Sequence, residues 1–359
     1  MEDLITSQKA TLGIQDFLNS AKNYTLDVFP EINLDNFFNT AIYNGKVDAS
    51  IMLPGITRII NNEIKLAVSL MINVLVVIII HSIFKSIIEG LENNSSSKIA
   101  YFVQYLIIVT LIINTFLSIL KITKAAITDI ISFMNLLIPL MTTLILTTGC
   151  ITTTSIIQPL LIFLVSFMGN FINNVIIPIL LISITLCIVS NISNKIQIDR
   201  LSKFLKSSII WILGIILTIF SCLLSIEGTL GSSVDGLTGK TAKAAVSNFI
   251  PIVGKVLGDT VDSVIGCSNV LKNSVGIIGI LIIAGIVLLP LIKLIVVFIS
   301  FYLTSAICEI VGDEKIVKLI TQISDSYKIL IAILLSVSVM FIIGITLVMK
   351  ITNTALMYR

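Results

Sequence analysis

The chain has 359 residues, of which 56% are hydrophobic and only 12% are charged, whereas soluble domains carry about 25% charged residues. So few charges cannot cover the surface of a soluble fold, and the composition excludes soluble enzymes, disordered proteins and nucleic-acid-binding proteins. The net charge of +3 is small. We therefore expect an all-α, polytopic integral membrane protein whose apolar residues face membrane lipid.

Residues 1–63 form a polar region that the periodicity predicts to be helical and to lie outside the membrane. The region holds eight acidic residues against four basic ones, a net charge of −4, so the remainder of the chain carries +7. The start Met1-Glu2-Asp3 carries two acidic residues where a signal peptide needs basic ones, and no apolar run precedes Ile64. This start predicts that the sequence carries no cleavable signal peptide.

Residues 64–225 are predicted to form a transmembrane bundle of about six apolar spans. From Ile130 to Asn194 there are 65 residues (194 − 130 + 1) without Asp, Glu, Lys or Arg, enough for three crossings at about 20 residues each. Polar turns at residues 147–155 and 169–174 would separate these three. The expected spans are Ile64–Phe84, Ile99–Leu120, Ile127–Leu146, Ile156–Phe171, Val175–Ser190 and Ser208–Ser225.

A basic loop and a C-terminal membrane region complete the expected topology. The loop Asn191–Lys206 is the most basic segment, which places it in the cytoplasm and the N-terminal region on the opposite side. Residues 226–274 form a Gly-rich amphipathic insertion, and residues 275–359 form the C-terminal transmembrane region, which ends with a span at Ile329–Met349. The run Val275–Cys308, about 51 Å as a helix, is either one kinked helix, which we favour, or a re-entrant hairpin. The total is seven or eight transmembrane helices.

No motif predicts an enzyme, a metal site or a cofactor. The only histidine, His81, lies in the first span without the neighbours that a zinc site or a catalytic triad needs. Gly239-Lys240-Thr241 lacks the earlier glycine of a phosphate-binding loop, because that position is Val234. The five cysteines form no CxxC pair and are expected to be buried thiols.

Polar residues at membrane depth are the candidate intramembrane sites, because charge in the bilayer is costly. Asp129 is either a residue at a helix N-terminus or a gate. Lys293 could snorkel, pair with a carboxylate or line an aqueous path. A threonine cluster at residues 142–154 is expected either to pack between helices or to line a hydrated path.

The insertion is the most informative segment. Apolar residues recur at helical spacing between Val246 and Ile265, and charged residues occupy the opposite face. Such a segment could lie in the membrane interface, re-enter the membrane or pack on a partner. The candidate channel or partner-contact residues are Asn248, Phe249, Pro251, Gly254, Lys255, Gly258, Asp259 and Asp262.

The insertion and its flanks carry a family resemblance. The segment GSSVDGLTGKTAKAAVSNFIPIVGKVLGDTVDSVIGCSNVLKNSVGIIG (Gly231–Gly279) resembles the stage III sporulation protein AE family, and the agreement includes IIQPLLIFLVSFMG (Ile156–Gly169) and VLLPLIKL (Val287–Leu294). The resemblance extends from Ile64 to the end of the chain.

That resemblance implies a multi-pass protein of the mother-cell (outer forespore) membrane of a sporulating bacterium. It implies a part in a transenvelope channel, or feeding-tube apparatus, required for late forespore development. The implied partners are the other proteins of the stage III sporulation A operon, including a separate ATPase, and a forespore-side channel partner. The family supplies no catalytic residues.

Two other functions remain open from the sequence. A secondary transporter working alone would use helices broken at Pro139, Pro159, Pro178 and Pro290 around a site at the membrane midplane. No convincing internal repeat supports it. The other is a scaffold with no conduit of its own.

Overall fold

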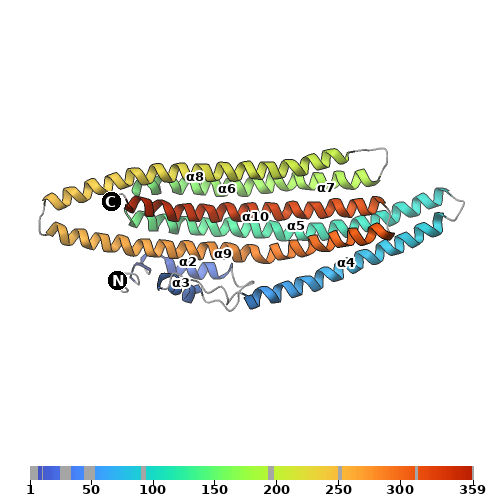
Figure 1. Cartoon of the computed structure of the whole chain (residues 1–359), viewed down its shortest axis with the longest axis horizontal. Helices are drawn as coiled ribbons and strands as arrows, with labels where there is room; N and C mark the ends of the chain where they lie inside the picture. The colour runs from blue at the N-terminus through green and yellow to red at the C-terminus, as the bar shows by residue number, and fades with distance from the viewer. Residues whose placement is uncertain are drawn as a thin grey trace.

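The computed structural model describes residues 7–9, 11–24, 34–43, 53–89, 94–192, 198–249, 253–311 and 314–357. The secondary-structure elements in these residues are all helices, and they form one elongated bundle (Figure 1). The predicted all-α membrane fold is thus confirmed. Within the described residues, six helical segments are long and apolar enough to cross a membrane. The sequence predicted seven or eight transmembrane helices. The number is smaller because some neighbouring predicted spans form one continuous helical segment.

Two short helices precede the bundle, α2 (Ile14–Lys22) and α3 (Leu34–Tyr43). The apolar face of α2 is buried, and the rings of Phe17 and Tyr24 lie 6.0 and 5.7 Å from the ring of Phe133. Phe133 belongs to α5, so the polar N-terminal region packs along the flank of the apolar bundle.

An acidic residue connects α2 to α3. Asp35 accepts a hydrogen bond from Gln15 at 3.0 Å and forms ion pairs with Lys22 at 3.3 Å and Lys9 at 3.9 Å. The hydrogen bond from Gln15, assisted by the two lysines, holds the pKa of the Asp35 carboxyl below its usual value.

The next two helices are α4 (Leu53–Glu89) and α5 (Asn94–Thr147). α5 joins two predicted spans, Ile99–Leu120 and Ile127–Leu146, so the expectation of separate crossings was wrong. The connecting residues Lys121–Ala126 contain neither Gly nor Pro and include good helix formers. With 54 residues, α5 is about 80 Å long, more than twice the thickness of the hydrocarbon core.

The predicted break after α5 is confirmed. Gly149 adopts a left-handed conformation with φ 78°, which glycine tolerates without strain, and α6 (Ile151–Phe171) then begins. The second predicted polar turn, at 169–174, was wrong. There the chain passes through a π-helical turn, Ile172–Ile176, directly into α7 (Ile177–Ile192). A π-turn keeps the backbone hydrogen-bonded, so the asparagines of this segment do not end the helix.

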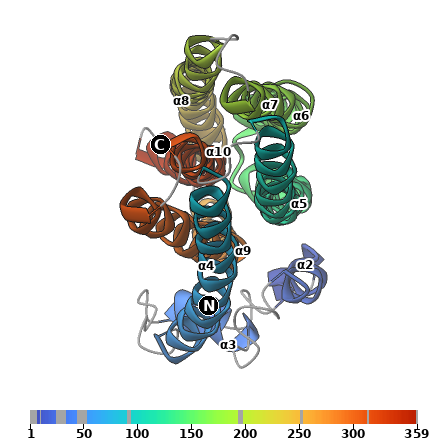
Figure 2. The same cartoon turned by 90° about the vertical axis from the view of Figure 1, so that its right-hand side faces the viewer.

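The remaining helices are α8 (Asp199–Phe249), α9 (Val253–Val311) and α10 (Glu314–Met357). α9 continues through Pro290, which confirms one helix for Val275–Cys308 and contradicts the re-entrant hairpin. Residues 226–249 continue α8, and residues 253–274 begin α9. Seen end-on, α10 lies among α5, α7, α8 and α9, all of which it contacts (Figure 2).

Candidate functional site

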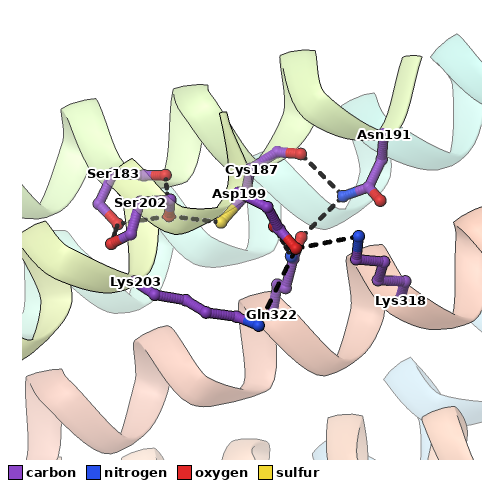
Figure 3. Close-up of polar contacts among 8 residues, drawn as sticks. All are labelled: Ser183, Cys187, Asn191, Asp199, Ser202, Lys203, Lys318 and Gln322. Carbon is purple, nitrogen blue, oxygen red and sulfur yellow. Dashed lines mark hydrogen bonds and ion pairs between the residues drawn. The ribbon is translucent and has the colours of Figure 1, made fainter. Parts of the chain in front are cut away.

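A cluster of polar side chains joins α7, α8 and α10 close to the end of α7 (Figure 3). Two residues of this cluster that bond each other directly, Asn191 and Gln322, are 131 positions apart in the sequence. We call it the α7–α8–α10 cluster. It consists of Ser183, Cys187, Asn191, Asp199, Ser202, Lys203, Lys318 and Gln322.

Gln322 of α10 is the centre of this cluster. Its Nε2 donates a hydrogen bond to Asp199 Oδ1, and its Oε1 accepts one from Asn191 Nδ2 at 2.7 Å. Asn191 also donates to the backbone carbonyl of Cys187 at 2.8 Å. One buried amide therefore connects the beginning of α8 to the end of α7.

The Asp199 carboxylate is also paired with two lysines of unequal geometry. Lys318 Nζ lies 2.9 Å from Asp199 Oδ2, whereas Lys203 Nζ lies 3.9 Å away and its side chain is 72% exposed. The longer, exposed pair is strongly screened by water. Lys318 is therefore the stronger ionic partner of Asp199.

Small polar groups hold α7 against α8 at very short range. The hydroxyls of Ser183 and Ser202 lie 2.9 Å apart, and each also donates to the carbonyl of the other residue, at 3.1 and 2.9 Å. Cys187 Sγ lies 2.9 Å from Ser202 Oγ. Such reciprocal bonds between small residues allow two helix backbones to approach closely.

Lys206 places a further cation beside the cluster. Only 9% of this residue is exposed, and its Nζ donates a 2.6 Å hydrogen bond to the backbone carbonyl of Gln322. A buried ammonium group is strongly destabilising without such a partner. Lys206, Asn191 and Asp199 thus all bind the same residue of α10.

The arrangement fixes helix positions and contains no recognisable catalytic set. Its donors and acceptors are directed at one another across three helices, which rigidifies a junction. Within the described residues, no group of three or more His, Cys, Asp or Glu side chains is placed to hold a metal ion.

The structure places the two predicted intramembrane sites apart from this cluster. Lys293 of α9 lies 3.6 Å from Glu63 of α4, and the two side chains are 27% and 14% exposed. Of the three expectations for Lys293, the geometry shows pairing with a carboxylate. Asp129 lies at an exposed position within α5, far from either end of that helix, because α5 is continuous.

Asp235 of α8 caps the N-terminus of α6. Its carboxylate oxygens accept hydrogen bonds from the backbone N–H groups of Thr152 at 3.0 Å and Thr153 at 2.8 Å. Asp235 is 4% exposed, and a buried carboxylate at this position is stabilised by the helix dipole. The first turn of α6 has no acidic residue of its own. That absence was the feature of the sequence that could have suggested a capping residue from another helix.

The threonine cluster around this cap serves the backbone. The hydroxyls of Thr142, Thr143, Thr148 and Thr154 each donate to a carbonyl three or four residues earlier. Three of these residues are buried. Packing between helices, one of the two expectations for the cluster, therefore describes them.

A second buried lysine lies near the same end of the bundle. Lys272 of α9 is fully buried and donates a 3.0 Å hydrogen bond from Nζ to the carbonyl of Met349 in α10. Close packing accompanies this bond, because a Cβ on Gly276 would lie 2.2 Å from the sulfur of Met349.

The candidate channel or partner-contact segment lies at the tip of the α8–α9 hairpin. Asn248 and Phe249 end α8, and Gly254, Lys255, Gly258, Asp259 and Asp262 lie in the first turns of α9. Pro251 lies outside the described residues. In Figure 1 this hairpin extends past α5, α6 and α10. Its role as a contact stays a prediction.

Several residues of the α7–α8–α10 cluster were not found from the sequence. Asp199, Lys203 and Lys206 were visible as a charged loop, but Gln322, which binds Asp199 and Lys206, lies more than a hundred positions later. A glutamine in an apolar helix was the signal, because a buried amide needs hydrogen-bond partners.

Comparison with known proteins relates the chain to one family. A family model described as Stage III sporulation protein AE matches residues 32–352. A relative from Bacillus subtilis (strain 168), Stage III sporulation protein AE, is 28% identical over 353 residues, which are 98% of this chain and 82% of the relative. No solved structure matches.

Proposed function

Because the chain belongs to the stage III sporulation protein AE family, we propose that it is a non-enzymatic integral membrane component of the sporulation channel between mother cell and forespore. The observation that carries this proposal is the family match over residues 32–352, which includes α4 to α9 and all but the last five residues of α10. In this proposal the protein lies in the mother-cell membrane and supports late forespore development.

The architecture suits a fixed membrane subunit. The α7–α8–α10 cluster and the Asp235 cap tie helices together at two places along the bundle. The tip of the α8–α9 hairpin extends beyond these ties, where it can reach other proteins. We assign to this tip the contact with further components encoded in the same operon, and the energy source to a separate ATPase.

A transporter that works alone receives less support from the geometry. That alternative requires helices broken near prolines at the membrane midplane. Pro139, Pro159 and Pro290 instead lie inside the continuous helices α5, α6 and α9. The fourth proline, Pro178, lies in the first turn of α7, directly after the π-helical turn, where the chain stays helical. Lys293, the charged residue beside Pro290, forms an ion pair with Glu63.

Deletion of the gene in its own host tests the proposal. We expect engulfment to proceed and the forespores to remain small and inactive. Replacement of Lys255, Asp259 and Asp262 by alanine should lower spore yield while the protein still accumulates in the membrane. Normal spores at wild-type yield from the deletion strain would refute the proposed function.

A further inference from the structure

The start of α8 concentrates positive charge on the surface of the bundle. Its first two turns carry three cations and one carboxylate, and α10 adds a further lysine beside them. These charged residues are Asp199, Arg200, Lys203, Lys206 and Lys318. Four cations therefore share one carboxylate, which leaves uncompensated positive charge at this end of the α7–α8–α10 cluster.

Two of the cations converge on a single oxygen atom. Lys203 Nζ of α8 and Lys318 Nζ of α10 lie 3.9 and 2.9 Å from Oδ2 of Asp199 (Figure 3). The two lysine side chains are 72% and 49% exposed. Because one carboxylate neutralises one ammonium group, the more distant and more exposed Lys203 keeps the capacity to bind a second anion.

Arg200 extends this positive surface along α8. It is exposed and forms no ion pair with any described residue. Residues three positions apart lie on the same side of a helix, so Arg200 and Lys203 are neighbours. A guanidinium group offers paired N–H donors that fit the oxygens of a phosphate group. The two residues thus present a pair of phosphate ligands to the outside of the bundle.

The same side of α8 becomes apolar within three turns. Exposed positions follow one another at steps of four, three and four residues, at Arg200, Phe204, Ser207 and Trp211. Phe204 is 65% exposed and Trp211 is 72% exposed. Ser207–Ile226 contains no charged residue. Cations followed by exposed aromatic side chains are typical of a helix surface at the boundary between lipid headgroups and acyl chains.

The other charged parts of the bundle leave this side of α8 open. In the end-on view, the charged helices α2 and α3 lie at the opposite edge of the bundle from α8, and α5, which carries Asp129, lies on a different side (Figure 2). A Cβ on Gly214, three residues beyond Trp211, would meet nothing within 4 Å. The surface beside the indole ring therefore has room for an acyl chain.

We propose that the start of α8 binds the phosphate headgroup of an anionic phospholipid, with Arg200, Lys203 and Lys318 as its ligands and Trp211 beside its acyl chain. A phosphodiester carries one negative charge on two free oxygens, which two cations share. Trp211 lies about 12 Å beyond Lys203 along α8, and one leaflet of the hydrocarbon core is about 15 Å deep. One lipid molecule can therefore contact both residues.

The aromatic residues favour lipid over an acidic protein segment as the partner. An acidic segment would match the cations and leave Phe204 and Trp211 without an apolar partner, whereas a phospholipid matches both parts of the surface. A bound headgroup also connects α8 to α10 at the α7–α8–α10 cluster. The proposal does not depend on the sporulation function.

The only tryptophan of the chain, Trp211, reports the lipid beside α8 directly. Purified protein is placed in two vesicle mixtures of phosphatidylglycerol and phosphatidylcholine, in which one or the other lipid carries brominated acyl chains that quench indole fluorescence on contact. We expect phosphatidylglycerol to be enriched beside Trp211 at least about five-fold over its share of the bilayer, which is the attraction of one uncompensated cation. Equal quenching by the two brominated lipids overturns the proposal.

Substitutions assign this preference to its ligands. Arg200→Ala combined with Lys203→Ala removes two exposed cations, and the preference for phosphatidylglycerol should fall to nearly none. Lys22→Ala is the matched control, because Lys22 also pairs with a carboxylate, Asp35 at 3.3 Å, and is 39% exposed, but belongs to α2 at the opposite edge of the bundle. If the double variant keeps the preference, or if Lys22→Ala loses as much of it, the proposal is overturned.

Inorganic phosphate distinguishes a lipid headgroup from a soluble anion as the ligand. The quenching is repeated with sodium phosphate and with sodium chloride at equal ionic strength, so that general screening is the same in both. We expect the same preference for phosphatidylglycerol in the two salts. If phosphate abolishes the preference and chloride does not, the site binds free phosphate, and the assignment to lipid is overturned.

Discussion

Removal of the Gln322 side chain should destabilise the bundle more than removal of any lysine of the α7–α8–α10 cluster. Gln322 is 7% exposed and makes two interhelical hydrogen bonds, to Asn191 and Asp199. Interhelical hydrogen bonds in membrane proteins contribute about 0.6 to 1.7 kcal/mol each. Gln322→Ala should therefore lower the free energy of unfolding by about 1–3 kcal/mol.

Two further variants separate the components of this effect. Lys203→Ala removes an exposed cation 3.9 Å from Asp199, and exposed ion pairs contribute about 0–1 kcal/mol. Asp199→Asn keeps a hydrogen-bond acceptor for Gln322 while it removes the charge that Lys318 binds. Its destabilisation should lie between those of the other two variants.

The assay is reversible unfolding in mixed detergent micelles, with helicity measured by circular dichroism as the denaturing detergent is increased. The order Gln322→Ala, then Asp199→Asn, then Lys203→Ala is the expected result. If Lys203→Ala destabilises the protein as much as Gln322→Ala, or if Gln322→Ala changes the free energy of unfolding by less than about 0.5 kcal/mol, the central position given to Gln322 is incorrect.

Three other perturbations follow from single contacts. A Cβ added at Gly231 would lie 3.0 Å from the Thr153 backbone, whereas a Cβ added at Gly214 would meet nothing within 4 Å. In the same unfolding assay, Gly231→Ala should therefore lower the free energy of unfolding, and Gly214→Ala should raise it by up to about 1 kcal/mol. Asp235→Ala should destabilise the protein by about 0.5–2 kcal/mol through loss of the cap on α6, and Asp235→Asn by less. The pKa of Asp35 is lowered on folding, so its contribution is present above the unfolded pKa, about 3.9, and is lost as pH falls further. Relative to an unfolded control substrate, pepsin should then cleave the N-terminal helices faster as pH falls below about 4, and Asp35→Asn should remove this difference between the two substrates.

The apolar content of the chain by itself determined that the protein is helical and lies in a membrane. Long runs without charge require helices in lipid, because the backbone there must satisfy its own hydrogen bonds. This reasoning located the apolar segments correctly, and it located the turn at Gly149. The family resemblance was also readable from local sequence, since it rests on runs such as Gly231–Gly279.

Where helices end and which side chains meet were decided by the tertiary structure. A lysine-containing segment such as Lys121–Ala126 is compatible with both a loop and a helix, and its surroundings chose the helix in α5. Similarly, the pairing of Gln322 with Asp199 depends on the packing of α10 against α8. Periodicity records which face of a helix is apolar. It does not record the relative height of two helices, which contacts such as that of Gln322 with Asp199 determine.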